Sequence, residues 1–193
     1  MRRELVFLLE EESAKALLDS FLPRLLAPGI QVRTMVFEGK QDLQRRMAQR
    51  IRGYVNPAAR FVLLSDQDST PDCRVVKQRF LEMCSESGRG NHCLVRIACR
   101  ELEAFYLADL RAVSQALEIP GLENAQNSQT FRNPDVQTGP SVLLERLTGG
   151  SYQKVGGSRR IGQFLDPRNT RSPSFRNFVA AILRQQDELL SLP

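Results

Sequence analysis

The pattern of apolar and polar positions predicts four strands. Residues 5–9 and 61–64 are unbroken apolar runs, typical of strands that are covered on both faces of a parallel sheet. Residues 30–37 alternate apolar with polar side chains, which indicates a strand nearer the sheet edge. A fourth apolar segment covers residues 93–99. These segments favour an α/β fold with about four mainly parallel strands flanked by helices.

Segments with a helical spacing of apolar residues lie between the predicted strands and after the last of them. The predicted helices cover residues 12–26, 41–54, 71–85, 102–113, 141–147 and 175–190. We expect Pro23 to kink or end the first of them. Val142 is expected to face inward with its leucine neighbours. Residues 121–137 are rich in Asn, Gln, Gly and Pro, and we expect a surface excursion there.

The length of 193 residues, with 41% hydrophobic and 25% charged residues, fits one compact unit. We divide it into an α/β core, residues 1–118, and a basic, loop-rich and helical C-terminal extension, residues 119–193, packed on that core. The apolar run at 5–9 is too short for a signal peptide or a membrane span. For this reason we expect no contact with a membrane. The four cysteines form no C-x-x-C pair, so we expect free thiols in a reducing cytoplasm.

Acidic residues follow three of the predicted strands. Asp66 and Asp68 end the third strand, Glu10 ends the first, and Glu101 and Glu103 follow the fourth. In parallel sheets the carboxyl ends of strands share one edge, so these side chains are candidate ligands of a Mg²⁺ ion. Asp is also an ordinary turn residue, and Glu in a first helical turn favours the helix dipole. The lone histidine, His92, begins the fourth strand at the opposite edge and is interpreted as structural.

The net charge of +5 is concentrated near the C-terminus, where residues 151–193 hold seven basic and three acidic side chains. Most of these basic groups stand among Gly, Ser, Pro and Asn, which predicts loops. The candidate nucleic-acid ligands are Lys154, Arg159, Arg160, Arg171 and Arg176. Gly156 and Gly157 would let a phosphate approach the backbone. The alternatives are a solvated basic surface or a docking face for a protein.

Several segments resemble the bacterial family called domain of unknown function 4276. The resemblance is carried by Leu8–Ser13, Leu64–Ser69, Asp72-Cys73, Arg96–Phe105, Tyr152–Gly157 and Arg171–Phe175, and it spans almost the whole chain. That family is similar to a variant of the Toprim fold of topoisomerases, primases and overcoming-lysogenization-defect nucleases. The resemblance therefore implies a Toprim-like, mostly parallel sheet flanked by helices.

The resemblance also implies roles for single residues. Glu10 matches the glutamate that ends the first Toprim strand, Asp66 and Asp68 match the Asp-x-Asp motif, and Glu101 or Glu103 matches a further acid of some related nucleases. Two positions depart from the Toprim pattern: Glu11 replaces a glycine, and Ala14 replaces a second acid. These departures weigh against a two-metal site and leave a one-metal site.

Two hypotheses from different classes follow. The first is a nuclease or phosphodiesterase that depends on Mg²⁺ or Mn²⁺ and acts on DNA or RNA, with Glu10, Asp66, Asp68 and Lys154 as catalytic residues. The second is a non-catalytic, Toprim-like partner or regulatory protein of an ATPase. The resemblance implies an ATPase partner of the kind paired with phage-defence nucleases under either hypothesis. The oligomeric state stays open, and a homo-oligomer is one alternative.

Overall fold

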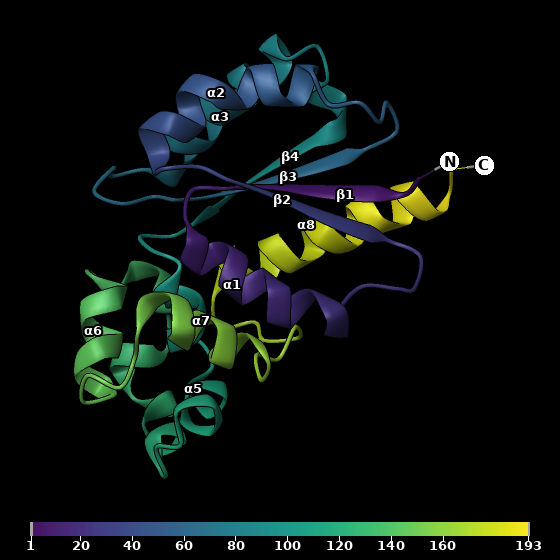
Figure 1. Ribbon diagram of the computed structural model, residues 1–193. Helices are drawn as coiled ribbons and strands as arrows, with labels where there is room; N and C mark the ends of the chain where they lie inside the picture. Colours follow the sequence, from purple (N-terminus) through teal and green to yellow (C-terminus); the bar gives the residue numbers. More distant parts are fainter. Residues whose placement is uncertain (1, 193) are drawn as a thin grey trace.

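A four-stranded parallel sheet forms the centre of the computed structural model, which describes residues 2–192 (Figure 1). Its strands are β1 (Glu4–Leu9), β2 (Gln31–Val36), β3 (Arg60–Asp66) and β4 (Cys93–Ala98). The strand order is β2-β1-β3-β4, and every neighbouring pair is parallel. The carboxyl ends of all four strands therefore lie along one edge of the sheet.

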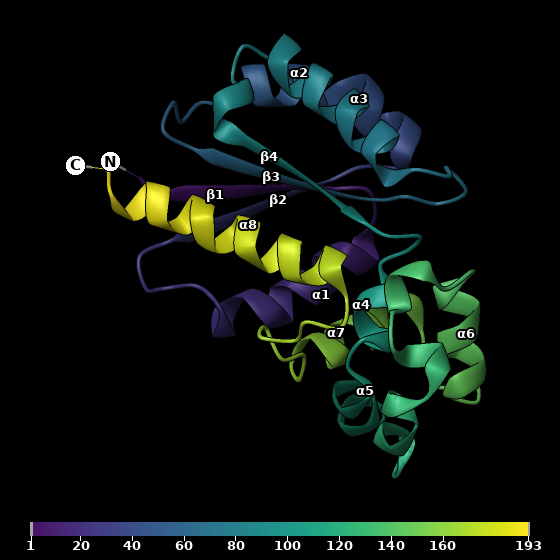
Figure 2. The same cartoon turned by 180° about the vertical axis from the view of Figure 1, so that it is seen from behind.

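The sheet is covered by helices on both faces (Figures 1 and 2). Helices α2 (Lys40–Arg52) and α3 (Cys73–Glu86) cover one face, while α1 (Glu12–Phe21) and α8 (Pro173–Leu190) cover the other. Since side chains alternate along a strand, β1 contributes to two separate apolar clusters. All six of its residues are buried, whereas β2 at the sheet edge is more exposed. The predicted α/β class with four parallel strands is confirmed.

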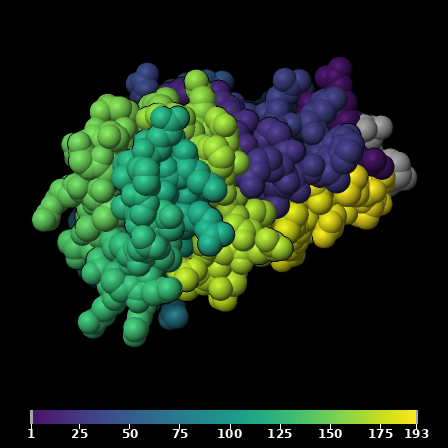
Figure 3. Space-filling model, turned by 90° about the horizontal axis from the view of Figure 1, so that it is seen from below, coloured from purple at the N-terminus to yellow at the C-terminus, as the bar shows by residue number. Residues whose placement is uncertain are grey.

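A helical region joins β4 to α8 and packs beside the carboxyl edge of the sheet. It contains α4 (Glu103–Leu107), α5 (Leu110–Leu117), α6 (Pro140–Leu147) and α7 (Lys154–Gly162), with 3-10 turns at Leu122–Asn127, Gln129–Phe131 and Pro134–Val136. Figure 3 shows these teal and green segments gathered at one end of the molecule. The division near residue 118 stays a prediction, and α8, from the C-terminal part, supplies one layer over the sheet.

Several local expectations need correction. Residues 121–137 lie mostly at the surface, as expected, but they form three 3-10 turns and bury Leu122 and Phe131 in the core. Val142 was expected inside, but 58% of it is exposed because it lies on the outer face of α6. The first helix ends at Phe21 with a 3-10 turn after it, which confirms the effect expected of Pro23.

The basic segment was predicted to form loops, but it begins with the regular helix α7. Its glycines allow close packing rather than flexibility. A Cβ added at Gly157 would lie 2.5 Å from the Tyr152 ring, and one at Gly162 would lie 2.8 Å from the carbonyl oxygen of Leu17 in α1. Gly157 is buried, so it offers a phosphate no backbone to approach, whereas Gly156 is exposed.

The two ends of the described chain lie together at the amino end of the strands (Figure 1), where Arg3 Nη2 donates to the carbonyl oxygen of Leu192 at 3.3 Å. Within residues 2–192, no helix combines the length and apolar character needed to span a membrane. The four cysteines are free thiols, as expected.

Candidate functional site

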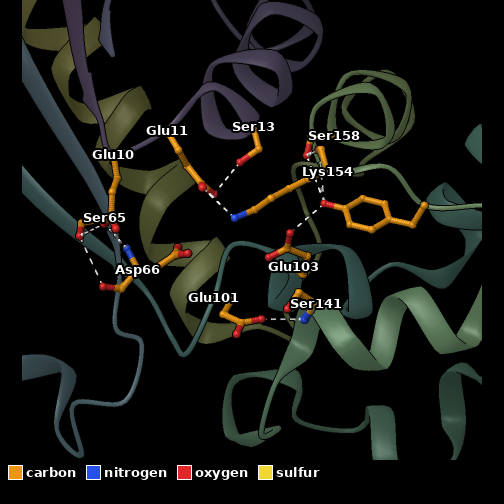
Figure 4. Close-up of polar contacts among 11 residues, drawn as sticks. Glu10, Glu11, Ser13, Ser65, Asp66, Glu101, Glu103, Ser141, Lys154 and Ser158 are labelled. Carbon is orange, nitrogen blue, oxygen red and sulfur yellow. Dashed lines mark hydrogen bonds and ion pairs between the residues drawn. The ribbon is translucent and has the colours of Figure 1, made fainter. Parts of the chain in front are cut away.

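Glu10 and Asp66 lie side by side where β1 and β3 end. Glu10 Oε2 accepts hydrogen bonds from Ser65 Oγ at 2.6 Å and from the Asp66 amide at 3.3 Å. Burial is the main cause that raises the pKa of Glu10, and the hydrogen bond from Ser65 opposes it. Glu10 is thus fixed against the end of the neighbouring strand, as the shared strand edge predicts (Figure 4).

The Asp66 carboxylate has no such support. Hydrogen bonds between Asp66 and the rest of residues 2–192 involve its backbone atoms, and no side-chain donor reaches its carboxylate oxygens. Burial raises the pKa of Asp66 well above its ordinary value, and the nearby charges of Glu103, Glu10 and Glu11 raise it further. Glu10, Glu11, Asp66 and Glu103 are called the acidic cluster below. Asp66 is its least compensated member.

Glu103 enters the acidic cluster from the first turn of α4, where it is only 1% exposed. Its Oε1 atom accepts a hydrogen bond from the Tyr152 hydroxyl at 2.8 Å. Burial raises the pKa of Glu103, while the hydrogen bond from Tyr152 acts in the opposite direction. Because the Tyr152 ring also packs on Gly157, the same side chain sets the position of α7 beside Glu103.

Lys154, the first residue of α7, reaches across to the acidic cluster (Figure 4). Its Nζ atom donates to Glu11 Oε2 at 2.7 Å, and Glu11 Oε1 accepts from Ser13 Oγ at 2.7 Å. Burial acts to lower the pKa of Lys154, but the hydrogen bond and charge of Glu11, with the charges of Glu103 and Asp66, outweigh it and raise this pKa. Lys154 is therefore held as a cation among acids.

Asp68 was predicted to end the third strand with Asp66, but β3 ends at Asp66 and the backbone leaves the extended conformation at Asp68. Its φ is +54°, in the left-handed region, and half of its side chain is exposed. Lys40 Nζ, from the start of α2, donates both to the Asp68 carboxylate and to the carbonyl oxygen of Asp66 at 2.6 Å. The charge of Asp68 raises the pKa of both Asp66 and Glu10. Asp68 therefore borders the acidic cluster while it is paired with Lys40.

Glu101 has a structural partner. Its Oε2 atom accepts a hydrogen bond from the Ser141 amide at 2.7 Å, in the first turn of α6. This contact satisfies one of the donors that a helix N-terminus leaves free, and it places a negative charge where the helix dipole favours one. The role of Glu101 as a metal ligand stays a prediction.

The other predicted nucleic-acid ligands lie on the surface outside the acidic cluster. Arg159 and Arg160 are exposed on α7, and Arg176 is exposed on the first turns of α8. Arg171 is exposed in the intervening loop, where it donates to Asn127 Oδ1 at 3.1 Å. Of the five predicted ligands, Lys154 is the one that the structure places in contact with the acids.

The acidic cluster offers carboxylate oxygens, the ligands that a hard cation prefers. Within residues 2–192, no three His, Cys, Asp or Glu side chains come close enough together to hold a metal ion. The donor types fit a hard cation, because Mg²⁺ prefers one or two carboxylates with waters completing its shell. The uncompensated Asp66 carboxylate, with Glu10 beside it, supplies that minimum.

Sequence reasoning missed the contributions of Glu11, Lys40 and Tyr152. Acids in the first turn of a helix were explained by the helix dipole, so the ion pair of Glu11 with Lys154 was not foreseen. The position of Lys40 offered a signal, since it follows the end of β2 and therefore lies at the same edge as Asp66. Tyr152 stood in a family-like segment, but nothing in its spacing pointed to Glu103.

A parallel sheet with acids at its carboxyl edge, flanked by helices, defines a Toprim-like α/β domain. The structure is similar to the C-terminal region of the Burkholderia pseudomallei OLD protein, with a TM-score of 0.53 and 16% identity over 98% of this chain and 99% of that one. The chain belongs to the family described as Domain of unknown function (DUF4276), whose model matches residues 9–183. The predicted family and fold are confirmed.

A second similar structure is the C-terminal region of the Xanthomonas campestris pv. campestris OLD protein. Its TM-score is 0.47, with 15% identity over 97% of this chain and 94% of that one. No curated protein matches this sequence.

Proposed function

We propose that the protein is a metal-dependent nuclease that hydrolyses phosphodiester bonds in DNA or RNA. The observation that carries this proposal is the partly buried Asp66 carboxylate, which accepts no hydrogen bond from residues 2–192 and lies among other acids at the carboxyl edge of the sheet. Such an arrangement costs folding free energy, and perturbed carboxylates of this kind concentrate at functional sites. A cation bound there would remove the repulsion.

The residues divide into two groups under this proposal. Asp66 and Glu10 hold Mg²⁺ or Mn²⁺, with Asp68, Glu101 and Glu103 as the further candidate ligands. The bound ion supplies polarisation of a phosphoryl oxygen and a water of lowered pKa.

Lys154 offsets the negative charge of the phosphate. To do so, it leaves its ion pair with Glu11 and contacts the phosphate instead. Glu10 is also placed to move a proton, because burial raises its pKa above the ordinary value of a glutamate.

A second candidate function is a non-catalytic partner or regulatory protein of an ATPase, including one that acts in phage defence. Two observations favour it. Lys154 and Lys40 already neutralise Glu11 and Asp68, and among residues 2–192 no three ligand-type side chains converge closely. In that case the acids and lysines together would be a structural network.

Cleavage of supercoiled plasmid and of labelled RNA separates the two candidates. We expect the purified protein to cleave at least one of them with Mg²⁺ or Mn²⁺, and EDTA to stop the reaction. Asp66→Asn should lower the rate by a factor on the order of 100 or more, because the central ligand loses its charge. Asp187→Asn, on the exposed face of α8 outside the acidic cluster, is the matched control and should leave the rate unchanged.

Absence of divalent-dependent cleavage of both substrates, with a folded protein, would support the non-catalytic candidate. Equal rates for wild type and Asp66→Asn would show that cleavage comes from elsewhere.

A further inference from the structure

A polar cavity of about 600 Å³ lies outside the acidic cluster, between α5 and the segment that follows α7. Its lining includes three arginines, one phenylalanine and three asparagines: Arg111, Arg168, Arg171, Phe164, Asn124, Asn127 and Asn169. We call it the α5–α7 groove. In Figure 3 the teal residues around α5 and the yellow-green residues after α7 lie beside each other on the face toward the viewer.

The charges of the α5–α7 groove are arranged unevenly. Asp109 is used internally, since its carboxylate accepts from the amides of Ala112 at 3.1 Å and Asp166 at 2.9 Å. Asp166 in turn pairs with Arg168 at 3.2 Å. Arg171 donates to an asparagine and has no carboxylate partner among residues 2–192. Three acids, Asp109, Glu123 and Asp166, match the three arginines in number, so the lining is neutral overall, and Arg171 is exposed without an ion pair among the described residues.

Phe164 is the feature that selects the ligand class. It is 42% exposed, and it is the single aromatic among the exposed large apolar side chains of residues 2–192. An exposed ring beside arginines and amides is what single-stranded nucleic acid uses, because bases stack on aromatic rings and phosphates contact cations. Paired bases in a duplex do not present a free face to such a ring.

Helix α7 connects the α5–α7 groove to the acidic cluster. Lys154 begins α7, and Phe164 follows its end, a span of about 15 Å at the helical rise per residue. Gly156 and Arg160 are spaced by four residues on α7, so they lie on one face, and Phe164 follows in the turn after the helix; all three are exposed. Nothing lies within 4 Å of a Cβ placed on Gly156, so the path is open there.

We propose that a single-stranded segment of DNA or RNA runs along this exposed face of α7 and stacks a base on Phe164 in the α5–α7 groove. Its phosphates face Arg160 and Arg171. This inference rests on the proposed function, since it makes the groove a holding site for the strand whose phosphodiester reaches Asp66. It narrows the substrate to nucleic acid with a single-stranded part.

Binding without cleavage tests the inference directly. The full chain in EDTA is titrated against a fluorescent oligonucleotide of about 20 nucleotides, single-stranded or as a duplex, and anisotropy is recorded. Phe164→Ala should weaken single-strand binding by about 5- to 100-fold and leave duplex binding unchanged, because one stacked base is lost. Phe164→Tyr should keep the affinity. Val142→Ala, also an exposed apolar residue, is the control.

Salt dependence gives a second, independent readout. Arg160→Ala and Arg171→Ala should each flatten the slope of log affinity against log salt concentration by up to about one. Arg79→Ala removes an exposed arginine from α3, across the sheet, and should not change the slope.

Failure of the inference and failure of the nuclease proposal look different. If folded Phe164→Ala binds the single strand as wild type does, the inference is overturned, even where plasmid cleavage continues. If wild type binds no oligonucleotide at low salt, it is also overturned, and a protein becomes the candidate occupant. If single-strand binding depends on Phe164 while no substrate is cleaved with Mg²⁺ or Mn²⁺, the inference stands and the nuclease proposal fails.

Discussion

Two carboxylates at opposite ends of the same sheet, one buried and one partly buried, have opposite surroundings. Glu4, at the amino end of β1, is 5% exposed and accepts hydrogen bonds from Asn56 Nδ2 at 2.9 Å and the Tyr54 hydroxyl at 3.3 Å. Arg33 Nε lies 3.9 Å away. Asp66, at the carboxyl end of β3, has acids for neighbours and no donor to its side chain among the described residues.

The difference shows what separates a structural carboxylate from a candidate functional one. Both carboxylates lose contact with water, Glu4 almost completely and Asp66 in part, so loss of solvent alone identifies neither as functional. A carboxylate shielded from water is normally compensated by donors or cations, as Glu4 is, whereas the charges around Asp66 are mainly those of other acids. For Asp66 the explanation proposed above is a cation that binds there.

The largest expected effect is on the free energy of unfolding, which alanine variants at Glu4 and Asp66 should change differently. Glu4→Ala should lower the free energy of unfolding by about 1.5–3 kcal/mol, because Asn56 and Tyr54 lose a charged acceptor. Asp66→Ala should leave this free energy unchanged or raise it in metal-free buffer, since it removes a repelled, desolvated charge. Urea denaturation at neutral pH measures both.

Glu4→Gln serves as the control in that experiment. It keeps an acceptor oxygen, so it should cost less than Glu4→Ala. The comparison breaks if Asp66→Ala proves as destabilising as Glu4→Ala, which would make Asp66 a structural residue as well.

Divalent ions should act on one end of the sheet and not on the other. At a concentration ten times the dissociation constant, Mn²⁺ or Mg²⁺ should raise the melting temperature by about 3–5 °C. The double variant Asp66→Asn, Asp68→Asn should lose this shift, and Glu4→Gln should keep it. Differential scanning fluorimetry with a millimolar titration measures it, and an equal shift in the double variant would locate the ion elsewhere.

The smallest expected effect is a dependence on pH. Burial raises the pKa of Asp66 above its value in the unfolded chain, so the folded protein holds this proton at pH values where the unfolded chain has released it. The contribution of Asp66 to stability is therefore favourable at low pH and is lost as pH rises through the folded pKa.

Asp66→Asn removes this dependence. In metal-free buffer its stability advantage over wild type should grow from acidic pH toward alkaline pH, as measured by denaturation across that range. A constant difference at all pH values would mean that the pKa of Asp66 is not raised.

The strands were predictable because their signal is local. Continuous apolar runs at β1 and β3 reflect burial on both faces, and the shared edge of parallel strands then brings Glu10 and Asp66 together without further information. The same local reasoning misplaced α7. Gly157 and Gly162 suggest a loop in sequence, but they are required where Tyr152 and α1 approach the helix closely.

Other parts of the site depend on contacts between distant segments. Asp68 turns away from an extended path in the left-handed conformation and meets Lys40, which is 28 residues earlier. Lys154 meets Glu11 across 143 residues. Residue spacing does not reveal contacts between segments this far apart in the sequence. The sequence therefore indicated the candidate acids and the basic segment, but not which acid pairs with which lysine.

The neighbouring chain ends, joined by the contact of Arg3 with Leu192, have a practical consequence for engineering. They lie at the amino end of β1, and the six residues of that strand separate them from Glu10 by about 20 Å. A purification tag or a fluorescent domain fused to either end would therefore stand clear of the acids. The same geometry suits circular permutation: a short linker could connect the two ends, and new termini could be opened at the exposed Gly88 turn between α3 and β4.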